Sequence, residues 1–143
     1  MGAHGRLLVI TPTTRPTALV LNLATVRLDV GAAWALAGNV LTCQAGADGI
    51  YELSVDLTLE NTAGTARTGV EFFAVINGVE EPDTSRDTYN RSLNVGRLGG
   101  SISGFARAFV AGDTIDLRAF RYFGLGPVAV RANGLTVLLK RIG

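Results

Sequence analysis

The side chains that could carry out chemistry are few in this chain of 143 residues. His4 is the only histidine and Cys43 the only cysteine, so an internal disulfide is excluded and a Ser-His-Asp triad would depend on one residue near the start of the sequence. No histidine accompanies Cys43, and we expect it to be a buried structural thiol. We therefore predict that the protein is not an enzyme.

The stretch from residue 80 to residue 87 is the best candidate for a metal site. It contains Glu80, Glu81, Asp83 and Asp87, and calcium needs several oxygen ligands that converge on one point. The spacing matches no EF-hand loop, however, and a solvated acidic loop is the simpler interpretation. We predict no metal site and no cofactor.

A second group of carboxylates consists of Glu52, Asp113 and Asp116. Glycoside hydrolysis uses a pair of carboxyl groups on either side of the scissile bond, and two of these residues could supply one. Asp113 follows Ala-Gly, which is typical of a tight turn, and the other two alternate with apolar residues as the surface positions of a strand do. We expect turn and surface roles for all three.

Arginine supplies nearly all of the basic charge. Arg118, Arg121 and Arg131 lie near Tyr122 and Phe123 in the sequence, and arginine beside aromatic rings can bind single-stranded nucleic acid. The formal net charge is only +1, whereas broad nucleic-acid binding needs a clustered positive field. We predict that these arginines line a subunit contact or a solvated face, with no nucleic acid as partner.

The composition is that of one folded domain. Hydrophobic residues make up 48% of the chain and charged residues 17%, which allows a real core. No apolar run reaches the roughly 18 residues that a membrane span requires, so no membrane partner is expected. Thr and Pro interrupt the apolar patch near the start, and no cleavage site follows, so we expect no signal peptide and use without secretion.

Period-two alternation predicts the strands. In residues 49–60 the apolar positions 51, 53, 55, 57 and 59 alternate with polar ones, as in an antiparallel strand with one buried face. Similar signals predict strands at 6–10, 18–28, 39–44, 69–76, 88–98, 101–110, 114–122, 128–131 and 135–142. No helix of ordinary length is expected, and the spacing of the strands predicts a sandwich or barrel.

Turn residues separate these segments. Asn77-Gly78 is the strongest hairpin signal, since both positions tolerate a positive φ. Further turns are predicted at Gly99-Gly100, Ala111-Gly112-Asp113 and Asn133-Gly134, with loops at 31–38 (around a packed Trp34), 81–87 and 124–127.

Several of these segments stand in the order of a known family. GIYELSVDL from residue 49, FFAVINGVEE from residue 72, SGFARAFVAGDTIDLRAF from residue 103 and the closing LTVLLKRI together resemble the C1q and tumour-necrosis-factor jelly rolls. The resemblance covers residues 49–142. It implies an all-β fold, a single antiparallel jelly-roll β-sandwich, which we assign to residues 21–143 behind an extended N-terminal arm of residues 1–20.

The N-terminal third allows two interpretations. It is apolar enough to need burial, yet Pro12 and Pro16 interrupt it. It could form the first strands of the sandwich, or it could be an arm that adds a strand to a neighbouring subunit or another protein.

The resemblance also implies a homotrimer with apolar faces packed around the threefold axis. Six aromatic residues are candidates for the sandwich core or for the trimer seam, and the sequence does not divide them between the two: Phe72, Phe105, Phe109, Phe120, Tyr122 and Phe123.

Jelly rolls of this kind are also similar to small structural proteins of tailed phages. We therefore expect a structural virion protein, a homotrimeric decoration (cement) protein that is made in the host cytoplasm and binds the major capsid protein on the capsid surface. Its capsid contact is expected in the arm, at Arg6, Leu7, Leu8, Val9 and Ile10. The alternative is a receptor-binding tail-fibre or spike tip, or a bacterial C1q-like binding module.

Overall fold

The computed structural model describes residues 8–23, 26–28, 31–61, 67–90, 97–124 and 128–143. In order along the chain, the strands are β1 (Leu8–Val9), β2 (Leu19–Val20), β3 (Val26–Leu28), β4 (Trp34–Ala37), β5 (Val40–Cys43), β6 (Gly49–Asn61), β7 (Thr68–Ile76), β8 (Val79–Glu80), β9 (Arg86–Asn90), β10 (Arg97–Phe109), β11 (Thr114–Gly124) and β12 (Val128–Arg141). Helical turns within the described ranges are 3-10 turns of three residues, η2 (Arg15–Thr17), η3 (Gly31–Ala33) and η4 (Pro82–Thr84), and no helix there could cross a membrane.

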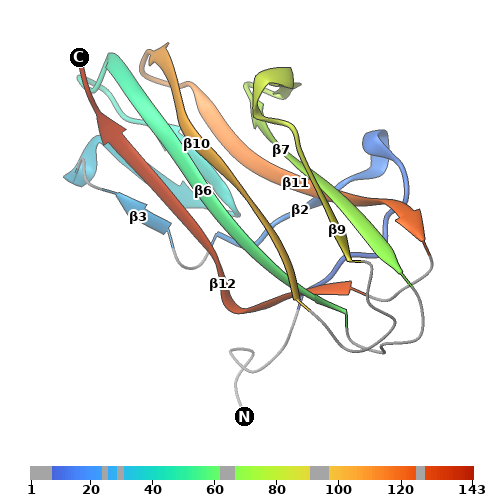
Figure 1. The fold of residues 1–143 in the computed structure, drawn as a ribbon. Coiled ribbons are helices and arrows are strands. Elements are labelled where there is room, and N and C mark those ends of the chain that lie inside the picture. The colour runs from blue at the N-terminus through green and yellow to red at the C-terminus, as the bar shows by residue number, and fades with distance from the viewer. Residues whose placement is uncertain (1–7, 24–25, 29–30, 62–66, 91–96, 125–127) are drawn as a thin grey trace.

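The strands form two sheets (Figure 1). Sheet one has the order β1-β12-β6-β10, with β3 parallel to β12. Sheet two has the order β4-β5-β11-β7-β8, with β2 beside β11 and β9 beside β7. From β5 onward the chain passes repeatedly between the sheets, because β6, β10 and β12 belong to sheet one while β7, β9 and β11 belong to sheet two. Antiparallel strands in this order make a jelly roll, so the predicted fold class is confirmed.

The core lies between the two inner faces. The apolar residues of β6 that were predicted to share a face are all buried in it: Tyr51, Leu53, Val55, Leu57 and Leu59. From sheet two, Ile115, Leu117 and Ala119 of β11 meet them, as their alternation predicted. Trp34, Tyr51 and Phe109 pack edge to face at one end of the core, with ring centroids 5.1 to 6.3 Å apart.

Two predicted turns lie inside strands instead. Gly99 and Gly100 belong to β10, where neighbouring atoms of β6, β7 and β9 leave no room for a side chain. A Cβ on Gly99 would lie 2.9 Å from the carbonyl oxygen of Leu57 in β6, and one on Gly100 would lie 2.9 Å from the Phe72 ring of β7. The glycines therefore mark close packing rather than a turn.

The predicted turn at Asn133-Gly134 is a bulge within β12. Val130 pairs with Leu59 and Leu135 pairs with Leu57, so residues 131–134 lie opposite the single residue Thr58. A Cβ on Gly134 would lie 2.6 Å from the Thr58 carbonyl oxygen, which explains the glycine.

Two predicted loops are also more ordered than expected. Residues 34–37 form β4 beside β5, and Trp34 is buried as predicted. Within residues 81–87, η4 and the start of β9 replace a solvated loop, because Thr84 is buried there and accepts a hydrogen bond from the Ala74 amide at 2.8 Å.

The predicted corner at residues 111–113 joins β10 to β11. Gly112 has a φ of 92°, a left-handed conformation that suits glycine. The Asp113 carboxylate accepts hydrogen bonds from the Val110 amide at 2.9 Å and from Asn77 Nδ2 at 3.0 Å. Asn77 Oδ1 in turn accepts from the Thr114 amide, so the predicted Asn77-Gly78 hairpin and this corner brace each other.

The pKa of Asp113 lies below its ordinary value of 3.8. The hydrogen bond from Val110 lowers it most, and the one from Asn77 lowers it further. A lowered folded-state pKa adds stability above the unfolded-state pKa, and this stability is lost as the pH falls through the folded-state value. We expect the free energy of unfolding to fall below about pH 4, and Asp113→Asn to flatten part of that fall. Urea midpoints of both proteins from about pH 2 to about pH 6 measure this, and parallel curves would contradict it.

Candidate functional site

Cys43, one of the two residues that might have been catalytic, is enclosed in the core. Cys43 is buried as predicted, with Sγ 3.7 Å from the Ala47 carbonyl oxygen, and burial raises the pKa of its thiol. A protonated, enclosed thiol is a poor nucleophile. His4 lies outside the described residues.

The carboxylates considered for glycoside hydrolysis lie on different surfaces. Glu52 of β6 alternates with buried residues and points outward from sheet one. Asp116 of β11 points outward from sheet two, where Arg118 Nε donates to it at 2.8 Å. Asp113 lies in the corner between β10 and β11. The structure therefore brings none of these residues into a catalytic pair.

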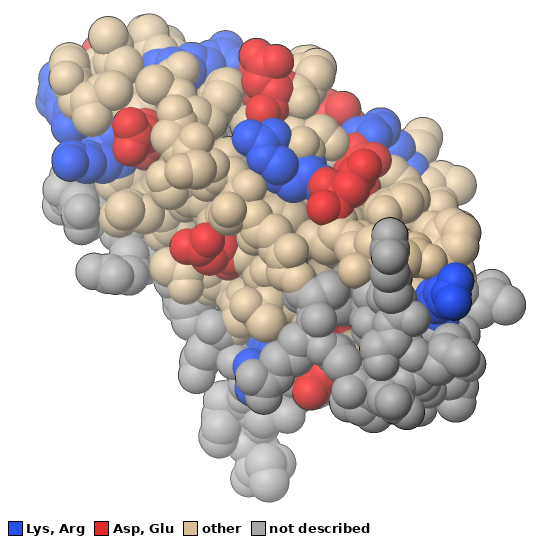
Figure 2. Space-filling model, in the orientation of Figure 1, with Lys and Arg blue, Asp and Glu red and all other residues tan. Residues whose placement is uncertain are grey.

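Two residues of the acidic stretch, Glu80 and Glu81, face different arginines. Glu80 forms an ion pair with Arg15 at 2.7 Å, and Glu81 lies 3.6 Å from Arg107. Across the ranges that the structure describes, no group of three or more His, Cys, Asp or Glu side chains could hold a metal ion. On the face shown in Figure 2, basic and acidic side chains are interspersed with uncharged ones.

The N-terminal segment from residue 8 to residue 21 packs on its own sandwich. Leu8 and Val9 pair with β12 of sheet one, and the Ile10 amide donates to the Val128 carbonyl at 2.9 Å. The Arg121 amide of sheet two donates to the carbonyl of Pro12 at 2.8 Å. The segment thus passes from one sheet to the other before β2 pairs with β11.

This path places the predicted arm residues in different environments. Ile10 is only 1% exposed and belongs to the sandwich core, whereas the Val9 side chain is exposed. For Leu8 the structure describes the pairing of its backbone with β12. Arg6 and Leu7 lie outside the described residues. The capsid contact of these residues and the domain boundary at residue 20 stay predictions.

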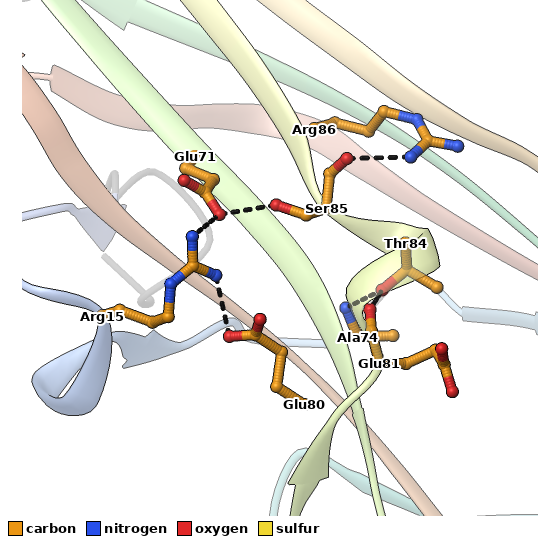
Figure 3. A network of polar contacts seen from close by, with 8 residues as sticks. All are labelled: Arg15, Glu71, Ala74, Glu80, Glu81, Thr84, Ser85 and Arg86. Carbon is orange, nitrogen blue, oxygen red and sulfur yellow. Dashed lines mark hydrogen bonds and ion pairs between the residues drawn. The ribbon is translucent and has the colours of Figure 1, made fainter.

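Arg15 fixes the segment to the outer face of sheet two (Figure 3). Its guanidinium donates to Glu71 of β7 and to Glu80 of β8, and Glu71 also accepts from the Ser85 hydroxyl at 2.5 Å. The Glu71 carboxylate is largely buried, so these donors replace the water it loses.

The same guanidinium covers a small apolar cluster. Phe73, Val75 and Phe120 form this cluster on the outer face of sheet two, and Ala18 packs against it. The Arg15 Cζ lies 5.2 Å and 5.3 Å from the centroids of Phe73 and Phe120, within the range of cation–π contacts. Every residue of β7 is consequently buried, although alternate ones point away from the core.

A pocket of about 270 Å³ opens beside this cluster. Arg15 and Arg118 line it together with Phe73 and Val75. Both arginines are already paired with carboxylates, so the pocket offers no cation to an incoming anion.

The six aromatic residues predicted for core or seam separate into three environments. Phe72 and Phe109 are buried in the core, and Phe105 is partly buried against it. Phe120 belongs to the outer cluster of sheet two. Tyr122 and Phe123 are exposed, at 42% and 48%.

A third exposed ring joins the last two. Tyr89 of β9 is 39% exposed, and its ring centroid lies 5.3 Å from that of Phe123. We call Tyr89, Tyr122 and Phe123 the aromatic patch. Tyr89 was not among the residues expected on a surface. Its position two residues after Asp87 in β9, on the same face of the strand, is the signal that could have placed it on an outer face.

The outer face of sheet one carries short polar, alanine and charged side chains. Paired positions across β10, β6 and β12 bring Ser101, Asp56 and Thr136 into one row and Ala106, Glu52 and Lys140 into another. Beside Ala108, the exposed Ile50 and Ile142 add apolar area at one end.

Comparison with known proteins gives structural neighbours alone. No protein-family model and no curated protein matches the chain. The crystal structure of murine APRIL at pH 5.0 is similar, with a TM-score of 0.47 and 14% identity, covering 95% of this chain and 98% of that one. Eiger TNF from S. frugiperda has a TM-score of 0.44 and 12% identity, covering 77% and 69%. The jelly-roll assignment rests on the strand order of this chain itself.

Arg15→Met tests whether the guanidinium holds the segment in place. We expect it to lower the free energy of unfolding by about 1–2 kcal/mol, because Glu71 would keep its charge with one donor fewer. The control Glu80→Gln should cost less, since Glu80 is more exposed than Glu71. Adding Glu71→Gln to Arg15→Met should recover part of the loss. Urea unfolding measures all four proteins, and an Arg15→Met variant within about 0.3 kcal/mol of the unchanged protein would contradict this role.

Proposed function

We propose that this chain is a structural virion protein, a homotrimeric decoration (cement) protein that binds and stabilises the head of a tailed phage. Its action would be passive. Contacts with the major capsid protein would add binding free energy at each subunit, and the trimer would couple those contacts by avidity. The protein would be made in the host cytoplasm and would act on the capsid surface.

The observation that carries the proposal is the outer face of sheet one. Short side chains on this face, Ser101, Ala106, Ala108 and Thr136, allow another subunit to approach closely, and Ile50 and Ile142 offer exposed apolar area at its end. Oligomers of a single chain are usually closed and symmetric, and a trimer would use this face three times. Of the charged groups on the face, Glu52 and Lys140 occupy paired positions on β6 and β12, which favours mutual neutralisation.

The capsid contact is proposed at the N-terminal end. Val9 is exposed beside β12, so its side chain can meet a partner without disturbing the core. Ile10 and Arg15 serve the sandwich itself, which confines the proposed contact to the part of the arm that precedes Ile10.

A receptor-binding fibre tip or a C1q-like binding module is the second candidate. The exposed aromatic patch favours it, because clustered aromatic side chains dominate many recognition surfaces. Binding of the isolated protein to host cells, without capsids, would select this function over decoration.

Removal of residues 2–7 tests the capsid contact while keeping Ile10, Pro12 and Arg15. We expect the shortened protein to retain its native mass and unfolding midpoint but to lose co-sedimentation with undecorated capsids. Arg15→Met is the matched control, because it disturbs the segment that follows the proposed contact and should still bind. Normal occupancy of the shortened protein on capsids would overturn the proposed contact.

A further inference from the structure

The aromatic patch is built around a ring that several features hold at the surface. Tyr122 is the extra residue of a bulge, since Arg121 pairs with Val70 and Phe123 with Gly69. The ring lies directly over Gly69, where a Cβ would be 2.7 Å from the Tyr122 Cζ. The Tyr122 hydroxyl donates to the carbonyl of Thr88 in β9 at 3.3 Å.

None of these features serves the main core. A glycine within a strand weakens it, and a bulge interrupts the hydrogen-bond ladder. Here both occur at one place, and the ring that they position is 42% exposed. Local departures of this kind are expected where a side chain is positioned for function.

The other two rings complete an angled arrangement. Tyr89 and Phe123 pair with the same residue, Gly69, from opposite sides of β7. Their ring planes meet at 62°, with centroids 5.3 Å apart. Two rings in edge-to-face contact suit a compact group above them better than the broad face of a sugar.

An exposed carboxylate lies near the patch. Asp87 precedes Tyr89 by two residues in β9, is exposed, and forms no ion pair or hydrogen bond within the described part of the chain. Burial raises the pKa of the Tyr122 phenol, and Asp87, Tyr89 and Glu71 raise it further. The phenol therefore stays neutral and can donate a hydrogen bond.

We propose that the aromatic patch, with Asp87, binds an arginine side chain of a partner protein. Electron-rich ring faces attract a cation, and a planar guanidinium can stack on a ring while it pairs with a carboxylate. The exposed Asp87 carboxylate, which has no ion pair within the described residues, supplies the charge complementarity. The patch belongs to sheet two, so self-association through the outer face of sheet one leaves it accessible.

The test is an NMR titration of the full-length protein with N-acetyl-arginine methylamide. We expect saturable shifts of backbone amides at Gly69, Tyr89 and Phe123. The neutral isostere N-acetyl-citrulline methylamide should bind at least about threefold more weakly, because it lacks the cation. Methyl glucoside serves as the probe for a sugar site.

Variants at exposed positions keep the test independent of folding. Asp87→Asn and Tyr89→Leu should each weaken binding of the arginine probe by about threefold or more, while Val79→Ala, in the exposed β8, should leave it unchanged. Equal affinity for the arginine and citrulline probes, tighter binding of methyl glucoside, unchanged binding in Asp87→Asn, or no saturable shift would each overturn the proposal.

Discussion

The fixed register of β6 is the constraint on which the rest of the sandwich depends. Its inner face carries large apolar side chains at every second position, and β10 and β12 pair with it on both sides. A slip of one residue would turn that whole face to solvent. Additional residues in the neighbouring strands must therefore leave the ladder as bulges, at 103–104 in β10 and at 131–134 in β12.

Sheet two shows the same principle with a different consequence. The register of β11 with β7 displaces Tyr122 into a bulge, and the Tyr122 ring therefore lies across Gly69. Along the remainder of that outer face, Arg15 and the segment around it cover the apolar cluster of Phe73 and Phe120. One end of the face is thus closed by the chain itself, and the other presents exposed aromatic rings.

The sequence predicted features that depend on local periodicity and failed where tertiary contacts decide. Alternation in β6 and β11, and the turns at Asn77-Gly78 and Asp113, are local signals and were confirmed. Gly99 and Asn133-Gly134 look like turns in sequence, but close approach to β6 requires those glycines within strands. Tyr122 and Phe123 could not be placed together on an outer face, because a bulge at Tyr122 breaks the alternation from which such a face is predicted.

The measurement that tests the central claim most directly is the native mass of the purified protein, by light scattering across a dilution series. The account predicts a mass of three 15.0 kDa chains that persists on dilution. It also predicts a lower mass for Ala108→Arg, which places a long charged side chain beside Ile50 on the outer face of sheet one, with an unchanged circular dichroism spectrum. A persistent monomer, or a trimer that Ala108→Arg leaves intact, would contradict assembly through that face.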